Sequence, residues 1–221
     1  MGQMRSSLSG LASGEIPDLA EALDSLTHRF GPYHPQTLAV ANRMAAALWD
    51  AGDIEQALAI LEQAVENSPE EDPIRSELLC TLGEIAVARG WFERAGSIYR
   101  ELLHLSTHRS GADHPDTLAA KGDLAVVLFD MGQAEEAARL EGEAYAAAKA
   151  CLGNLHPVSS VLAWNRALRL ETCGEFDLAR TTVVDELSWL LTKEDAGLEP
   201  DQRMIRSMLT ERWNWDVATA C

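Results

Sequence analysis

The chain has 221 residues, 47% of them hydrophobic, and its 35 Asp and Glu against 18 Lys and Arg give a formal net charge of −17. This acidic balance, in a chain without a run of Lys or Arg, argues against nucleic acid or an anionic membrane surface as a partner. We expect no membrane-spanning helix and no signal peptide, because no apolar run is long enough. The four cysteines form no C-x-x-C pair, which indicates reduced thiols in a cytoplasmic protein.

In chain order, residues 1–13 come first, and we expect them to form a disordered leader. Similar phrases then recur, namely GPYHPQTLAV (31–40), GADHPDTLAA (111–120) and GNLHPVSSVL (153–162). Four prolines are each followed at the same spacing by a glycine and then by an alanine: Pro35, Pro73, Pro115 and Pro157. This fixed spacing predicts a repeat domain over residues 14–196. It comprises a half repeat at 14–30 and full repeats from about residues 34, 72, 114 and 156.

Each repeat is expected to contain two helices. Proline favours the first helical position, where no N–H group is needed, so each repeat proline should begin a first helix. Glycine should end that helix in a left-handed conformation. A second stretch follows with the apolar spacing of an amphipathic helix, and nothing has the pattern of a strand. Repeats differ in length only between the glycine and the next proline, by four residues, which should lengthen a helix or its loop.

Small residues recur where the two helices of a repeat should approach closely: Ala45, Gly83, Ala125 and Ala167 in the first helices, and Ala57, Ala95, Ala137 and Ala179 in the second. These positions, the glycine turn and the second-helix alanine resemble the tetratricopeptide repeat. The long period and the HP-x-T-L opening resemble the kinesin-light-chain-type subfamily over roughly residues 14–193. The resemblance implies an all-α fold, a right-handed superhelical solenoid of antiparallel helix pairs with about four and a half TPR-like repeats.

The resemblance also implies that the first helices line a concave groove that binds peptides or protein segments. Asn42 and Asn165 match positions where kinesin-light-chain-type repeats carry asparagines that hold a peptide backbone. An amide suits that task because it both donates and accepts hydrogen bonds. The predicted groove residues are Asn42, Arg43, Trp49, Asp50, Glu77, Glu84, Asp123, Phe129, Asp130, Trp164 and Asn165.

The predicted groove is acidic and bears aromatic side chains, so we expect a protein or peptide partner with apolar and basic residues. Packing between helices is an equal alternative for each aromatic residue, and a solvated helix surface is the alternative for each acid. We therefore expect a protein–protein interaction scaffold or adaptor. The alternative is a ligand-gated regulator that senses a small molecule or a signalling peptide.

The histidines of the repeated phrase are interpreted as part of a helix-start device. His34, His114 and His156 lie about one repeat or more apart, so they should not converge on a metal. His104 and His108 have the i, i+4 spacing of a chelating pair but lack the acidic residue of an H-E-x-x-H motif. We expect no metal and no cofactor. Phosphate-binding and nucleophile motifs are also missing from the sequence, and we expect that the chain is not an enzyme.

Residues 197–221 are expected to form a C-terminal capping helix, beginning at about Asp201, and a tail. Apolar residues share one face of this helix, with Trp213 nearby: Met204, Ile205, Met208 and Leu209. The last repeat of a solenoid exposes an apolar edge, so capping is the first interpretation. A homodimer contact or a docking tail is the alternative.

Overall fold

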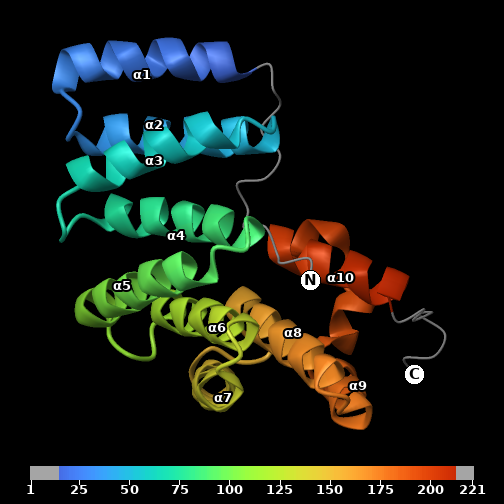
Figure 1. Ribbon diagram of the computed structural model, residues 1–221. Coiled ribbons are helices and arrows are strands. Elements are labelled where there is room, and N and C mark those ends of the chain that lie inside the picture. Colours follow the sequence, from blue (N-terminus) through green and yellow to red (C-terminus); the bar gives the residue numbers. More distant parts are fainter. Residues whose placement is uncertain (1–14, 213–221) are drawn as a thin grey trace. The chain divides into compact units, whose positions relative to one another are not determined.

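A computed structural model describes residues 15–212 of the chain. The expected leader, residues 1–13, and Trp213 lie outside these residues. The described residues form two compact units, which divide between Gly111 and Ala112. Within the described residues all regular structure is helical and no strand is present (Figure 1). The expected all-α class, with consecutive helices packed as in a repeat solenoid, is confirmed.

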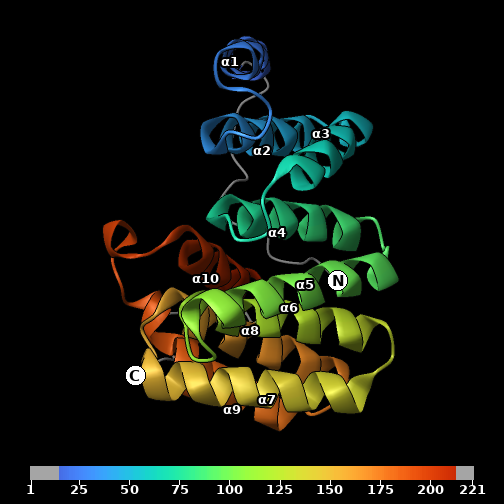
Figure 2. The same cartoon turned by 90° about the vertical axis from the view of Figure 1, so that its left-hand side faces the viewer.

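The first unit is a stack of helices in which each contacts the next (Figures 1 and 2). Its helices are α1 (Ile16–Phe30), α2 (Pro35–Asp50), α3 (Ile54–Asn67), α4 (Pro73–Ala88) and α5 (Phe92–Ser110). The two first helices of this unit, α2 and α4, also contact each other directly. Their neighbouring faces therefore form one continuous surface.

The second unit repeats the arrangement and adds a further helix at its end. Its elements are α6 (Pro115–Asp130), α7 (Ala134–Cys151), α8 (Pro157–Thr172), α9 (Phe176–Leu187), the 3-10 helices η2 (Ser188–Leu191) and η3 (Asp195–Gly197), and α10 (Pro200–Arg212). Here α8 contacts both α6 and α10, and Figure 1 shows α10 in red beside α8 in orange. The helix α10 thus stands where the first helix of a further repeat would pack.

The predicted helix starts are confirmed at all four prolines. Pro35, Pro73, Pro115 and Pro157 each occupy the first position of their helix. Proline fits there because its missing N–H would have no partner inside the helix, and its fixed φ suits the first turn.

All four first helices end in the same backbone turn. After α2, the N–H of Gly52 donates to the carbonyl of Trp49 and the N–H of Asp53 donates to the carbonyl of Leu48, at 3.0 and 2.8 Å. Gly52 has a φ of 88°, in the left-handed region that glycine adopts without a β-carbon clash. This is the Schellman motif, and the same pair of bonds follows α4, α6 and α8. The residue before the turn glycine differs in every copy: Ala51, Arg89, Met131 and Cys173.

The eight small residues at the predicted helix contacts are all buried. Gly83 shows how close the contact is: a β-carbon on this residue would lie 2.8 Å from Cζ of Tyr99 on α5. The approach of α4 and α5 therefore depends on the absence of a side chain at residue 83.

The four extra residues of the longer repeats lie in the second helix. The helices α5 and α7 have 19 and 18 residues, whereas α3 has 14. The connections that follow α3 and α5 are similar in length, residues 68–72 and 111–114. Four residues make about one helical turn, so the longer helix keeps nearly the same buried face.

The last helix, α10, begins at Pro200, one residue before the predicted start. Ile205 and Leu209 are fully buried, whereas Met204 and Met208 are half-buried, so only part of the predicted apolar face is enclosed. Nε2 of Gln202 donates to the carbonyl of Leu155, at 3.0 Å. These contacts fix α10 against α8, and the capping role remains a prediction.

Candidate peptide-binding surface

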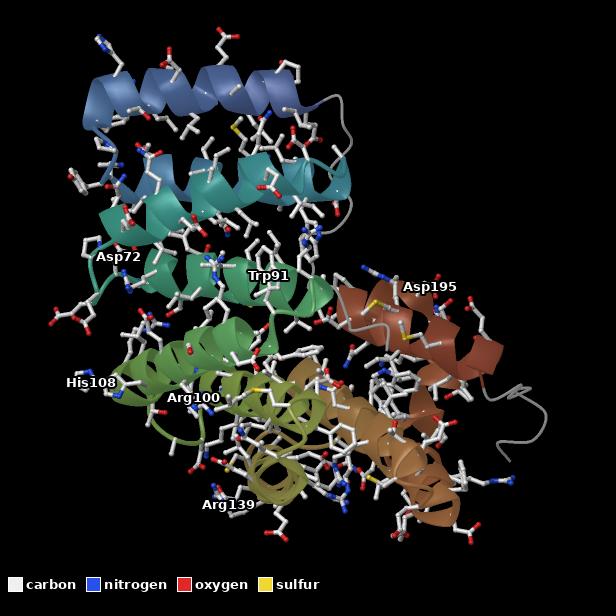
Figure 3. All side chains as sticks on the ribbon, viewed as in Figure 1. Asp72, Trp91, Arg100, His108, Arg139 and Asp195 are labelled. Atoms are coloured by element: carbon white, nitrogen blue, oxygen red, sulfur yellow. The ribbon has the colours of Figure 1, made fainter. Side chains whose placement is uncertain are left out.

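The repeated histidines cap the first helices on which the predicted groove residues lie. In α2, α6 and α8, Nδ1 of the residue before the proline accepts a hydrogen bond from the backbone N–H two residues later. The pairs are His34 with Gln36 at 3.2 Å, His114 with Asp116 at 3.3 Å, and His156 with Val158 at 3.2 Å. In α4 the same role falls to Asp72, labelled in Figure 3, whose Oδ1 accepts from Ile74 at 3.0 Å. The interpretation as a helix-start device is confirmed.

Six predicted groove residues lie in the first unit, on the adjacent helices α2 and α4. Arg43 on α2 and Glu77 on α4 are exposed. Three others are half-buried: Trp49, Asp50 and Glu84. The thiol of Cys80 donates to Oε1 of Glu84 at 3.7 Å, which orients this carboxylate along α4. The α2–α4 surface therefore carries three acids and one base among its predicted groove residues.

Asn42, the sixth residue, does not face solvent as expected. Its side chain is only 3% exposed, and Oδ1 is buried without a hydrogen-bond partner. Such a buried oxygen costs about 1–3 kcal/mol when no donor reaches it. Asn42 therefore retains an unused acceptor on the helix where the resemblance implies contact with a peptide backbone.

The second unit holds the other five predicted residues, on α6 and α8. Four of them are half-buried: Asp123, Phe129, Asp130 and Asn165. Burial raises the pKa of Asp130 above its usual value, since a partly enclosed carboxylate loses hydration.

Trp164 corrects the expectation of an exposed aromatic anchor on α8. Trp164 is 1% exposed, and it is among the largest fully buried side chains of residues 15–212. Trp164 therefore packs in the core, which was the alternative interpretation for each aromatic residue. Trp49 and Phe129, both half-buried, keep part of their surface accessible.

A charged network between α7, α8 and α9 was not anticipated. The carboxylate of Glu141 on α7 is nearly buried and accepts hydrogen bonds from Arg169 and Arg166 on α8. The Arg166 guanidinium lies over the ring of Tyr145, 5.4 Å from its centre. Burial, followed by a hydrogen bond with Glu186, raises the pKa of Tyr145.

The repeat register contained the signal for this network. The position of Glu141 in its repeat is occupied by Leu61, Tyr99 and Val183 in the other copies, and all of these side chains are buried. A charge at a position that is otherwise apolar indicates a buried ion pair, because an unpaired charge would be too costly there.

The pair His104 and His108 lies exposed on α5, with His108 labelled in Figure 3. Across residues 15–212, no group of three or more His, Cys, Asp or Glu side chains is placed to hold a metal ion. None of the described helices has the length and apolar character needed to cross a membrane.

The family model of the tetratricopeptide repeat matches residues 16–70 and 75–150, which is more than half of the chain. The chain belongs to the tetratricopeptide repeat family. The family resemblance inferred from the sequence is therefore confirmed. Both matched segments lie within the helical repeats described above.

Solved structures similar to this tetratricopeptide repeat protein include two of the nearly identical TPR-like repeats of a kinesin-light-chain protein from Podosopora anserina. They are 19% and 20% identical, with TM-scores of 0.65 and 0.63, over 91% and 90% of this chain and 90% of each of theirs. BtubC (BKLC) from P. vanneervenii is 13% identical, with a TM-score of 0.70, over 98% of this chain and 87% of its own. At these identities the similarity concerns the fold.

Curated relatives include the clustered mitochondria protein homologs of Culex quinquefasciatus and Aedes aegypti. Each is 26% identical over 161 residues, or 73% of this chain. The match spans 9% and 8% of their own lengths, so the chain corresponds to a small part of these much longer proteins.

Proposed function

We propose that this tetratricopeptide repeat chain is an interaction scaffold or adaptor that holds a peptide or protein segment on its first helices. The observation that carries the proposal is Oδ1 of Asn42, a buried acceptor without a partner. A backbone N–H of a bound segment would satisfy it once the Asn42 side chain turns outward from its buried position, and an amide can hold a backbone whatever side chains the segment carries. Asn165 on α8 stands one position later in its repeat than Asn42, whose equivalent is Trp164; it is half-buried, and its amide could hold a peptide backbone in the second unit.

The chemistry of the partner follows from the residues near Asn42. The predicted groove residues of the first unit include three acids, Asp50, Glu77 and Glu84, and a single base, Arg43. The half-buried Trp49 adds an aromatic surface. A segment with Lys or Arg and an apolar anchor would complement these groups, with charge attraction acting mainly on the association rate.

Several narrower properties belong to the same proposal. We place the chain in the cytoplasm, with its four cysteines as reduced thiols, since none of them forms a C-x-x-C pair. We assign it a binding role without catalysis, consistent with its family. A homodimer through α10 is compatible with the half-buried Met204 and Met208.

The experiment is an affinity capture with the parent chain, followed by calorimetry with the captured partner. We expect one recurrent protein or peptide, bound less tightly by Asn42→Ala by about tenfold, because a donor of the partner would be left unpaired. Retention of a small molecule in place of a protein would favour the alternative, a ligand-gated regulator.

A matched pair of charge variants locates the binding surface. Glu77→Lys with Glu84→Lys reverses two charges on the first helix α4, and we expect slower association that raised salt also produces in the parent. Glu55→Lys with Glu66→Lys makes the same change at exposed residues of the second helix α3. If both pairs of substitutions weaken partner binding equally, or if only the α3 pair weakens it, the binding surface does not lie on the first helices.

A further inference from the structure

Three of the four first helices begin with a cap that a single proton removes. We propose that His34, His114 and His156 make the repeats sensitive to mild acidification, while α4, capped by Asp72, keeps its start. The basis is the hydrogen bond that each of the three Nδ1 atoms accepts from the backbone. A neutral imidazole has one acceptor nitrogen, whereas the protonated ring has two donors and none.

The direction of the effect follows from which form can accept. The neutral ring caps the helix, so the stabilisation is present at higher pH and is lost as the pH falls. Histidine side chains ordinarily gain their proton between about pH 8 and pH 5. The new positive charge also lies at a helix N-terminus, where the helix dipole opposes it. Aspartate side chains ordinarily stay ionised above about pH 5, so the cap of α4 persists through this range.

Groups around each histidine should set the size of its contribution. His34 stacks on Phe30 with ring centres 4.6 Å apart, and the Arg29 guanidinium lies over that same ring at 4.8 Å. Neither neighbour gives the protonated ring an ion pair, so these contacts do not offset the loss of the cap at α2.

His114 differs because an acid lies next to its capping nitrogen. Oδ2 of Asp116 is 3.5 Å from Nδ1 of His114, so the protonated ring would gain an ion pair that offsets part of the lost cap. We expect the smallest pH effect at α6.

His156 begins α8, where α10 packs. Gln202 on α10 donates to the carbonyl of Leu155, the residue before the histidine, and is flanked by Asp201 and Arg203. The amide of Gln202 is neutral and gives the protonated ring no ion pair, so we expect the loss of the cap at α8 to be larger than at α6.

The test compares melting temperatures at pH 7.5 and pH 5.5. In a variant with His34→Asn, His114→Asn and His156→Asn, the asparagine oxygen can cap each helix at either pH. We expect the melting temperature of the parent to fall by roughly 4–8 °C more than that of this variant, mainly through the caps of α2 and α8. Asp72→His should increase the fall beyond that of the parent, because it adds a fourth proton-sensitive cap.

The chain offers a matched control in its other three histidines. His28, His104 and His108 are exposed and cap no helix start, and His28 and His108 lie in the last turns of α1 and α5, where the helix dipole favours a positive charge. Replacing all three with Asn should therefore leave the fall of the parent in place or enlarge it slightly. If the cap variant does not fold, the single variants suffice: His34→Asn and His156→Asn should each reduce the fall more than His114→Asn. The proposal would be overturned if the melting temperature of the cap variant fell as far as that of the parent, or if the control variant showed no fall.

Discussion

The carboxylate of Glu141 on α7 binds the guanidinium of Arg169 on α8 through two hydrogen bonds, of 2.5 Å from Nε and 3.2 Å from Nη2. The Glu141 side chain is 5% exposed and that of Arg169 is 17% exposed. An ion pair that is largely removed from water joins the second helix of one repeat to the first helix of the next.

Glu141→Ala should destabilise the protein by about 2–4 kcal/mol, because it leaves Arg169 and Arg166 partly buried without their carboxylate. Urea unfolding measures the change. Glu143→Ala is the control, since Glu143 pairs with Arg139 on the exposed face of the same helix and should cost less than about 1 kcal/mol. Equal losses for the two variants would show that the buried pair contributes no more than a surface one.

Gly83→Ala should destabilise the first unit by about 1–3 kcal/mol, since the new β-carbon would press on the ring of Tyr99. Thermal unfolding is the measurement. The matched control is Gly142→Ala on α7, where a β-carbon meets nothing within 4 Å. That change should stabilise the helix by about 0.5–1 kcal/mol. Similar effects at the two glycines would contradict the close contact of α4 with α5.

Asn42→Leu should stabilise the free protein by about 1 kcal/mol, because it removes a buried acceptor that has no donor. Under the proposed function it should also weaken partner binding by about tenfold. Thr37→Val is the control on the same helix, because Oγ1 of Thr37 is likewise buried without a partner. That variant should be stabilised and bind normally. If Asn42→Leu binds the partner as tightly as the parent does, Asn42 is not part of the proposed site.

Asp201→Asn should stabilise the protein at pH 7. Burial and the nearby charge of Glu199 raise the pKa of Asp201, so its proton is held more tightly in the folded chain than in the unfolded one. The ionised form therefore opposes folding at neutral pH, and this penalty disappears as the pH falls through the folded pKa. The difference in melting temperature between variant and parent should shrink between pH 7 and pH 3.5. A constant difference would exclude titration as its cause.

The parts of the fold that follow backbone rules were predictable from the sequence. Proline at a helix start and glycine in a left-handed turn act within a few residues, and four copies at one spacing identify them. The burial of Asn42 and Trp164 was not predictable in this way, because it depends on the volumes of side chains from neighbouring helices. Glu141 lies between these cases: its repeat register marked it as unusual, but only packing shows which arginines it meets.

The shared turn at the ends of α2, α4, α6 and α8 also provides a set of equivalent attachment points for spectroscopic labels. The turn is held by backbone hydrogen bonds and its glycine, so it does not require a particular side chain at the preceding residue, which is Ala51, Arg89, Met131 or Cys173. Cys173 is already an exposed thiol. A cysteine substituted at any of the other three, with the native exposed thiols replaced, would carry a dye at the same place in its repeat, so signals from different repeats could be compared directly.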